Sequence, residues 1–225
     1  MAEPGRGLLV VFEGVEGAGK TTQIHRLAAR LAERGITYWH YREPGGTPLG
    51  EQVRELLLQP GETIVPRAEA LLFMAARAQL VARIEAHRAR GEILLLDRFF
   101  LSTYAYQVAG RQLPEPEVRA ANRLATGGIV PNITLLLTIP AAEAERRVDR
   151  RGERDRLEQE GRDFHARVAA AFAEFLDPAW GAAHPEAGPI VPVDGGGPAE
   201  AVERAILAEL ARRWPETFAG PPESQ

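Results

Sequence analysis

Three glycines, a lysine and a threonine lie close together between residues 14 and 21. The segment Gly14-Val-Glu-Gly-Ala-Gly-Lys-Thr21 matches the pattern G-x-x-x-x-G-K-[ST]. In this pattern the glycines let backbone N–H groups surround phosphate oxygens, the lysine reaches the β and γ phosphates, and the threonine hydroxyl ligates Mg²⁺. The segment therefore predicts a site for ATP and Mg²⁺. The residues expected to bind ATP are Gly14, Val15, Glu16, Gly17, Ala18, Gly19, Lys20, Thr21 and Thr22.

Lys20 is the single lysine among the 27 basic residues of the chain. A planar guanidinium cannot replace a compact ammonium inside a tight phosphate loop. The only lysine of the chain thus lies at the position where phosphate binding requires a lysine. A GTPase is excluded, because its base-reading Asn-Lys-x-Asp motif needs a further lysine.

The composition excludes other classes of function. The 225 residues include no cysteine and carry a net charge of −4, so thiolate chemistry is excluded and no overall positive field attracts nucleic acid or membrane. The two serines, Ser102 and Ser224, lie outside any Gly-x-Ser-x-Gly setting, which argues against a serine hydrolase. The apolar run at residues 8–12 is too short for a signal peptide or membrane span. We therefore expect a cytoplasmic protein.

Short apolar runs alternate with helical patterns along the chain. The runs at 8–13, 36–41, 93–96, 133–137 and 190–193 are typical of strands. Helical periodicity occurs at 21–34, 52–58, 68–88, 115–125, 141–151, 163–176 and 199–213. This alternation predicts an α/β protein with a five-stranded parallel sheet flanked by helices. We expect one domain at residues 1–214, with a short lid at about 146–162, and a disordered tail at 215–225.

The third apolar run ends at Asp97, and Arg98 follows it. Nucleotide enzymes hold the metal and its water at this end of a parallel strand. ATP-driven motors commonly place a glutamate after the aspartate to activate water, whereas an arginine stabilises the charge of a transferred group. The Asp-Arg pair therefore favours a kinase, with Thr21 and Asp97 at the metal.

Eight arginines occur between residues 146 and 167, interleaved with acidic residues. Most of them are expected to lie on a solvated helix in pairs such as Glu143 with Arg147. Gly152 interrupts the run, so we also expect the segment to hinge, to exclude water and to supply positive charge.

Phe73 and Arg77 lie four residues apart in the helical segment 68–88 and so share a face. A ring with a guanidinium one turn away can stack on a nucleobase and hydrogen-bond its carbonyl edge. The same spacing also suits an ordinary packing face. We expect the opposite stripe to pack on the sheet; it comprises Leu71, Met74, Ala75, Ala78 and Val81.

Five segments resemble the bacterial thymidylate kinases, in the order and spacing of that family. They are FEGVEGAGKTT, REPGGT, LLFMAARAQ, DRFFLSTYAYQ and RRGERDRLEQE, and the resemblance extends from about residue 8 to residue 211. It implies a three-layer P-loop kinase fold, a homodimer, and Mg²⁺-dependent transfer of the ATP γ-phosphoryl group to dTMP, giving dTDP.

The resemblance assigns roles to individual positions. Glu16 resembles the carboxylate that holds the deoxyribose 3′-OH, Phe73 the ring that stacks on thymine, and Arg77 the donor to its O4. Arg98 resembles the residue that clamps the acceptor and transferred phosphates. The remaining substrate positions are Thr103 and Gln107 at the base edge, Tyr106 where a ribose 2′-OH would lie, and Arg42 and Pro44 at the monophosphate pocket.

In this family the catalytic arginine comes from either the phosphate loop or the lid. The variable loop positions 15–18 carry no basic residue. The resemblance therefore implies lid arginines, Arg151 and Arg156, with Glu158 nearby, and leaves open which of the two reaches the transferred group. Together with Lys20 and Arg98, these are the expected catalytic residues.

Two other functions remain compatible with the sequence. One is a kinase of another small acceptor, such as a different nucleoside monophosphate. The other is an ATP-dependent switch or motor, which hydrolyses ATP without an acceptor.

Overall fold

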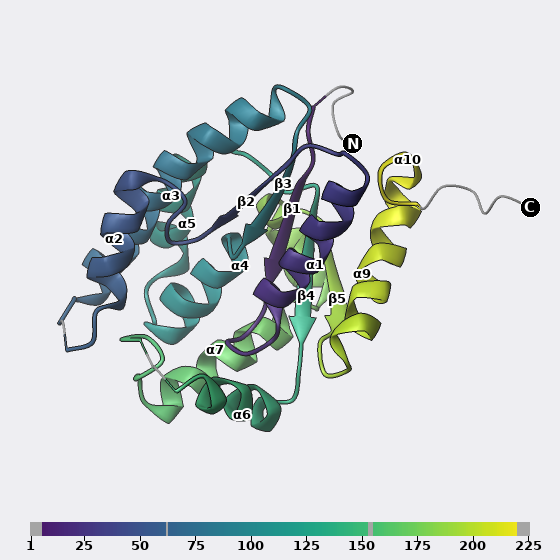
Figure 1. The fold of residues 1–225 in the computed structure, drawn as a ribbon. Helices are drawn as coiled ribbons and strands as arrows, with labels where there is room; N and C mark the ends of the chain where they lie inside the picture. The colour runs from purple at the N-terminus through teal and green to yellow at the C-terminus, as the bar shows by residue number, and fades with distance from the viewer. Residues whose placement is uncertain (1–5, 62, 153–154, 220–225) are drawn as a thin grey trace, which may run out of the picture.

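The sheet has five parallel strands in the order β2-β3-β1-β4-β5 (Figure 1). The computed structural model describes residues 6–61, 63–152 and 155–219. The strands are β1 (Leu9–Glu13), β2 (Tyr38–Arg42), β3 (Ile93–Asp97), β4 (Ile133–Thr138) and β5 (Ile190–Asp194). Each coincides with one of the apolar runs. The prediction of an α/β protein with a five-stranded parallel sheet is therefore confirmed.

Successive residues of the central strand β1 point to opposite faces of the sheet and join two separate cores. Leu9 and Val11 pack in one core, and Val10 and Phe12 pack in the other. The first core is completed by α3 (Pro66–Arg88) and α7 (Arg162–Glu174), and the second by α1 (Lys20–Glu33) and α9 (Ala199–Arg213). Helices on both faces explain why β1, β3 and β4 are almost continuously apolar.

The remaining helices lie around these layers (Figure 1). They are α2 (Pro48–Leu58), α4 (Phe100–Thr103), α5 (Glu115–Thr126), α6 (Ala141–Arg151), α8 (Pro178–Ala183), α10 (Pro215–Phe218) and the 3₁₀ turn η2 (Pro185–Ala187). α4 continues directly into a π-helical segment, η1 (Tyr104–Gly110). Such segments occur often at functional sites.

Two expectations about the helices are wrong. Leu71 is 61% exposed, and Ala75 and Ala78 are also exposed. Of the predicted stripe only Met74 and Val81 are buried, and Val81 alone packs in the core with the strands. α3 contacts α2, α5 and β3, which spreads burial around the helix and also buries Glu69 and Arg77.

The second error concerns the C-terminal tail. Residues Pro215–Phe218 form a helix, and Phe218 is buried in the core with α1 and α9; residues 220–225 lie outside the described part. Among the described residues, no helix has both the length and the apolar character needed to cross a bilayer.

Candidate active site

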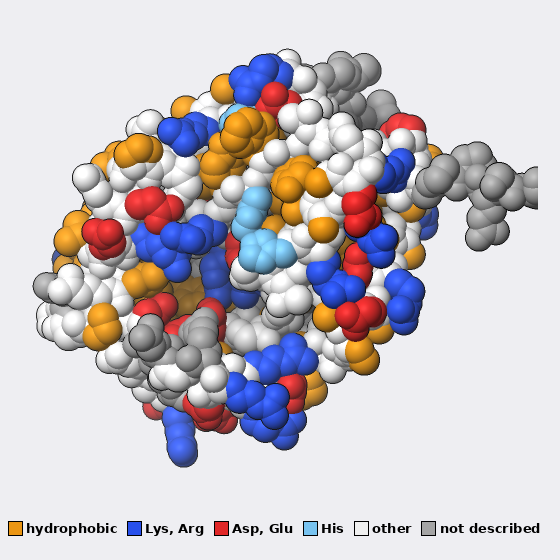
Figure 2. Space-filling model, viewed as in Figure 1, with side chains coloured by type: hydrophobic (Ala, Val, Ile, Leu, Met, Phe, Trp, Pro, Cys, Tyr) orange, Lys and Arg blue, Asp and Glu red, His pale blue; other side chains and the backbone are white. Residues whose placement is uncertain are grey.

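A cavity of about 1330 Å³ lies at the carboxyl ends of β1, β2 and β3. Figure 2 shows its mouth as a hollow with Lys and Arg side chains around it and histidines at its rim. Pockets for one small ligand usually enclose about 300–1,000 Å³, so this cavity has room for more than one. The predicted residues that line it are Glu16, Gly17, Ala18, Gly19, Lys20, Thr21, Thr22, Arg42, Pro44, Phe73, Arg77, Asp97, Arg98, Thr103, Tyr106 and Gln107.

The phosphate loop takes its shape from glycines. Gly14 and Gly17 have φ angles of 137° and 76°, which other residues rarely adopt. A Cβ atom at Gly14 would lie 2.4 Å from the carbonyl oxygen of Leu137, so the close approach of β4 also requires glycine. α1 begins at Lys20, directly after the loop, and the positive end of its dipole therefore lies at the cavity.

Lys20 is held inside this loop. Its Nζ donates hydrogen bonds to the carbonyl oxygens of Gly14 and Val15, at 3.0 and 2.9 Å. Burial, together with repulsion from Arg98, lowers the pKa of Lys20 to about 8. The ammonium thus loses its proton at a lower pH than an exposed lysine would, unless anionic groups approach it.

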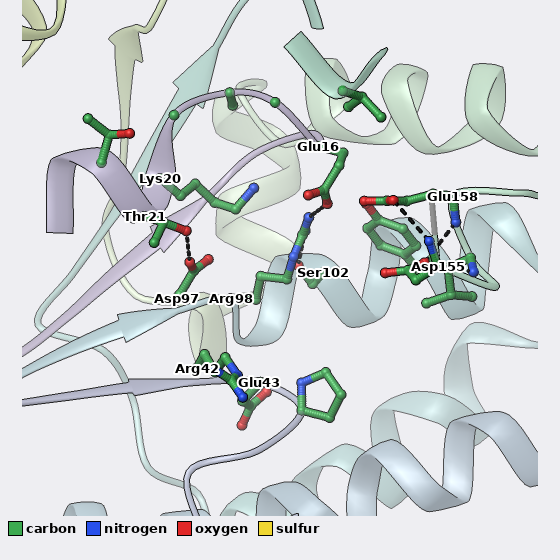
Figure 3. Close-up of a pocket in the computed structure, with 18 of the residues that line it drawn as sticks. Glu16, Lys20, Thr21, Arg42, Glu43, Asp97, Arg98, Ser102, Asp155 and Glu158 are labelled. Atoms are coloured by element: carbon green, nitrogen blue, oxygen red, sulfur yellow. Dashed lines mark hydrogen bonds and ion pairs between the residues drawn. The ribbon is translucent and has the colours of Figure 1, made fainter. Parts of the chain in front are cut away.

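Thr21 and Asp97 come together at the proposed metal position. The hydroxyl of Thr21 donates a hydrogen bond of 2.8 Å to Oδ2 of Asp97 (Figure 3). Two adjacent oxygen ligands suit Mg²⁺, which usually takes one or two carboxylates and completes its shell with water and phosphate oxygens. Across the described ranges there is no group of three or more His, Cys, Asp or Glu residues placed to hold a metal. The ligand set fits Mg²⁺ shared with a nucleotide.

Arg98 lies at the centre of the cavity wall. Its Nη2 donates to Glu16 at 2.6 Å, and its Nη1 donates to Ser102 at 3.1 Å (Figure 3). Its guanidinium carbon lies 5.2 Å from the ring centroid of Tyr106. Burial alone would lower the pKa of Arg98, but Glu16, Asp97 and Glu13 raise it overall. Its φ of 70° is unusual for a non-glycine residue, and such strain is typical of functional positions.

Glu13 fixes the backbone around Arg98, and sequence reasoning missed it. This fully buried carboxylate accepts hydrogen bonds from the backbone N–H of Phe99 and Ser102 and from the Ser102 hydroxyl, at 2.7, 3.0 and 2.7 Å. An acidic residue at the end of an otherwise apolar strand is the signal that could have indicated it.

The residues expected to bind the acceptor also line the cavity. Phe73 comes from α3, Thr103 from α4, and Tyr106 and Gln107 from η1. Burial raises the pKa of Tyr106 to about 12, so its phenol stays neutral. Arg42 and Pro44 follow β2 and lie on the same cavity wall.

Arg77 lines the cavity but is engaged by protein groups. All five N–H groups of a guanidinium have acceptors here: the carboxylate of Glu43, Oγ1 of Thr103, Oδ1 of Asn122 and the carbonyl oxygen of Phe99. Donation to a base would require Arg77 to give up one of these bonds. Glu43 and Asn122 were not indicated by the sequence, although Glu43 lies inside the REPGGT motif.

The two arginines predicted to act from the lid, Arg151 and Arg156, differ in what the structure shows of them. The side chain of Arg151 lies outside the described part. Arg156 is buried, and its Nη2 donates to Glu69 at 2.7 Å and its Nε to the carbonyl oxygen of Leu57 at 2.7 Å. Arg156 therefore faces α2 and α3 and is absent from the cavity lining. A fully buried carboxylate binds the guanidinium here, so the prediction that Arg156 reaches the phosphates stays a prediction and requires Arg156 to leave Glu69. Glu158 does line the cavity.

The cavity lining also includes Arg147, His25 and His40, which the sequence had not assigned to it. Arg147 pairs with Glu143 at 2.8 Å as expected, and its Nη1 also donates to the carbonyl oxygens of Gly17 and Gly195, at 3.4 and 3.2 Å. His25 and His40 have ring centroids 5.6 Å apart. Burial, followed by the neighbouring His25, lowers the pKa of His40. No motif pointed to these histidines.

A phosphate loop between a central parallel strand and a helix, with an arginine instead of a water-activating carboxylate beside it, defines a P-loop phosphotransferase. The thymidylate kinase family model matches residues 12–183. The chain belongs to the thymidylate kinase family.

Individual relatives cover most of the chain. It is 43% identical over 209 residues to a thymidylate kinase of Deinococcus radiodurans, covering 92% of this chain and 98% of the relative. It is 52% identical over 165 residues to that of Thermomicrobium roseum, covering 72% and 78%. It is 45% identical over 170 residues to that of Carboxydothermus hydrogenoformans, covering 75% and 84%.

Proposed function

We propose that this chain transfers the γ-phosphoryl group of ATP to dTMP, giving dTDP and ADP. The observation that carries the proposal is that one cavity is lined by Lys20 and Arg98, by residues after β5, and by residues of α3 and η1. We call the part near the loop after β5 the donor arm, and the part near α3 and η1 the acceptor arm. A motor or switch needs a site for one nucleotide. A phosphotransferase needs a site for the donor and a site for the acceptor, which meet at the phosphates.

The donor arm extends from the phosphate loop toward the loop after β5. Arg147, Gly195, Gly197 and Ala199 line it. A guanidinium plane such as that of Arg147 suits a purine base, which can stack on it. We assign this arm to the adenosine of ATP.

The acceptor arm lies on the other side of Arg98 and takes the thymidine. Phe73 offers a ring for stacking, and Gln107 and Thr103 offer polar groups to the base edge. Glu16, Arg42 and Pro44 are assigned to the deoxyribose and monophosphate. Tyr106 is assigned to the position of a ribose 2′-OH.

Catalysis in this arrangement depends on positioning and charge. Lys20 bridges the β and γ phosphates, and Arg98 moves from its pair with Glu16 to neutralise charge between acceptor and donor. Mg²⁺, held by Thr21 and Asp97, would supply further charge neutralisation on the phosphate oxygens. We assign residues 146–162 as the lid, and the late charge to Arg151.

We also propose that the enzyme is a cytoplasmic homodimer. Exposed apolar side chains on and after the packed helices α3 and α5 support this assembly, among them Leu71, Leu124 and Val130. Light scattering should give twice the chain mass, and Leu71→Glu with Leu124→Glu should give the monomer.

An ADP-release assay with ATP and Mg²⁺ tests the activity. The acceptors should be dTMP, dUMP, UMP, CMP and AMP, with chromatography to identify the diphosphate. Preferred turnover of dTMP supports the proposal. Equal or better turnover of another monophosphate points to a different kinase, and ADP release without an acceptor points to a switch or motor.

A further inference from the structure

The carboxylate of Glu69 lies at the meeting point of the acceptor arm and the lid. Glu69 is fully buried and belongs to the same helix as Phe73. Nε2 of Gln107 donates to its Oε1 at 3.1 Å, and Nη2 of Arg156 donates to its Oε2 at 2.7 Å. Arg111 adds a bond from Nη2 to Oε2 at 2.8 Å. One anion is thus shared by a base-edge residue, a lid residue and the segment that follows η1.

The charge of Glu69 determines which way the Gln107 amide points. A carboxylate only accepts hydrogen bonds, so it binds the NH₂ end of the amide and turns the oxygen away. An amide oxygen accepts from the N3–H of a thymine or uracil ring, whereas the N3 atom of cytosine is itself an acceptor. Glu69 therefore presets Gln107 to accept from an imide N–H in the acceptor arm.

The lid reaches the same carboxylate by two routes. Arg156 contacts Glu69 directly, and it also holds the end of α2, because its Nε donates to Leu57 and its backbone N–H to the carbonyl oxygen of Leu58, at 2.7 and 3.1 Å. Glu160 pairs with Arg111 at 2.6 Å. Carbonyl groups at a helix C-terminus lack partners within the helix, so a guanidinium there is well placed.

The charges of this cluster balance whether or not the lid is docked. Docked, it contains two anions, Glu69 and Glu160, and two cations, Arg111 and Arg156. If residues 155–160 withdraw, one cation and one anion leave together, and Glu69 keeps Arg111. An unpaired buried charge is strongly destabilising, and this composition avoids it in both positions. Although burial raises it, bonds from Arg111 and Arg156 hold the pKa of Glu69 below its usual range, so the anion persists at neutral pH.

We propose that Glu69 is a positioning residue that couples base recognition to lid docking by holding Gln107 and Arg156 through one carboxylate. Coupling of this kind is reciprocal. An imide base on Gln107 stabilises the docked lid, and the docked lid stabilises the base. The inference rests on the proposed transfer to dTMP and adds a residue that the sequence did not indicate.

Two substitutions separate base recognition from lid docking. Glu69→Gln removes the charge that orients Gln107 and binds Arg156, so it should weaken both base recognition and lid docking. Arg156→Met leaves Glu69 with Arg111 and Gln107, so it should disturb lid docking more than the orientation of Gln107, and it remains a test of the proposal if Glu69→Gln fails to fold. Arg156→Lys should recover part of the loss. Glu209→Gln and Arg212→Met are matched controls in a surface pair on α9.

The kinetic readout is the ratio of kcat/KM for dTMP to that for dCMP. Glu69→Gln should lower this ratio at least tenfold, and Arg156→Met should lower it less, because Gln107 keeps its bond to Glu69. Both variants should lower kcat with dTMP about tenfold and raise ADP release without acceptor several-fold. Unchanged ratio and unchanged ADP release in folded variants would overturn the proposal. If the wild type itself forms no dTDP, the proposed function fails instead.

Hydrogen exchange gives a readout that does not depend on turnover. In the wild type, dTMP should slow exchange of the lid amides, including that of Arg156, which bonds to Leu58. This protection should be lost in Glu69→Gln and retained in Glu209→Gln. Equal protection in both variants would show that base and lid are independent.

Discussion

The guanidinium of Arg98 and the carboxylate of Glu16 lie 2.6 Å apart, although 82 residues separate them in the chain. The phosphate loop thus contributes an anion to the wall on which phosphates are expected to bind. This pair keeps Arg98 oriented and charged while leaving Glu16 near the proposed sugar site. When a phosphate arrives, Arg98 can exchange one anionic partner for another without being left unpaired in a buried position.

Arg98→Ala should lower kcat by about 10²- to 10³-fold, the usual effect of removing one preorganised donor to developing charge. Steady-state assays with saturating ATP and dTMP measure it. Arg119→Ala, in a surface pair with Glu186, is the control and should stay near wild type. An unchanged kcat in the Arg98 variant would remove this residue from the mechanism.

Activity should fall at alkaline pH because Lys20 loses its charge. The pKa of Lys20 is lowered to about 8 by burial and by Arg98, so the ammonium is present below that pH and lost above it. We expect kcat/KM for ATP to be flat near pH 7 and to fall about tenfold per pH unit well above pH 8, since this parameter reports the free enzyme. kcat should be less affected, because bound phosphates favour the charged form. A profile flat to pH 10 would contradict this role.

The sheet and the phosphate loop could be predicted because their signals are local. The loop between residues 14 and 21 needs glycine and lysine for steric and chemical reasons, and Asp97 with Arg98 ends an apolar run. Such features depend on neighbours in the chain. Parallel strands with helices on both faces then bring these loops to one edge, and the structure places them there.

The network around the site could not be predicted, because it depends on burial of charged side chains by distant elements. Glu13, Glu43 and Glu69 are buried, while acidic residues are usually exposed. Arg156 has a long flexible side chain, so its position along the chain does not determine whether it meets a phosphate or Glu69. Leu71 was placed on the wrong face because α3 is packed from several directions.

Glu43→Gln should destabilise the fold. Arg77 and Glu43 are 3% and 5% exposed, and removing one partner of a buried ion pair usually costs about 3–5 kcal/mol. For a chain of this size that corresponds to a Tm lower by roughly 6–20 °C. Calorimetry measures it, with Glu209→Gln in the surface pair with Arg213 as the control. Equal Tm values for the two variants would mean that the buried pair contributes no net stability.

Tyr106→Ala should weaken the preference for deoxyribose. Because its ring also lies against Arg98, Tyr106→Phe is the matched control that keeps the ring and removes only the hydroxyl. dUMP and UMP differ only at the 2′ position, so the ratio of their kcat/KM values isolates the effect. We expect this ratio to fall at least about tenfold in the alanine variant, within the range of steric discrimination by a pocket, and to persist in the phenylalanine variant. An unchanged ratio in Tyr106→Ala would assign the discrimination to another residue.

Arg151→Ala should lower kcat by about 10³- to 10⁵-fold, the contribution of an arginine finger in phosphoryl transfer, with little change in KM. Arg151 ends α6 and follows Arg147 by four residues, about one helical turn, and Arg147 already contacts the phosphate loop at Gly17. Arg156 is bound to Glu69, so Arg156→Met should lower kcat only about tenfold. Single-turnover assays at saturating ATP and dTMP distinguish the two, because they measure transfer apart from product release. A larger loss in Arg156→Met than in Arg151→Ala would mean that Arg156 leaves Glu69 during the reaction and supplies the catalytic charge itself.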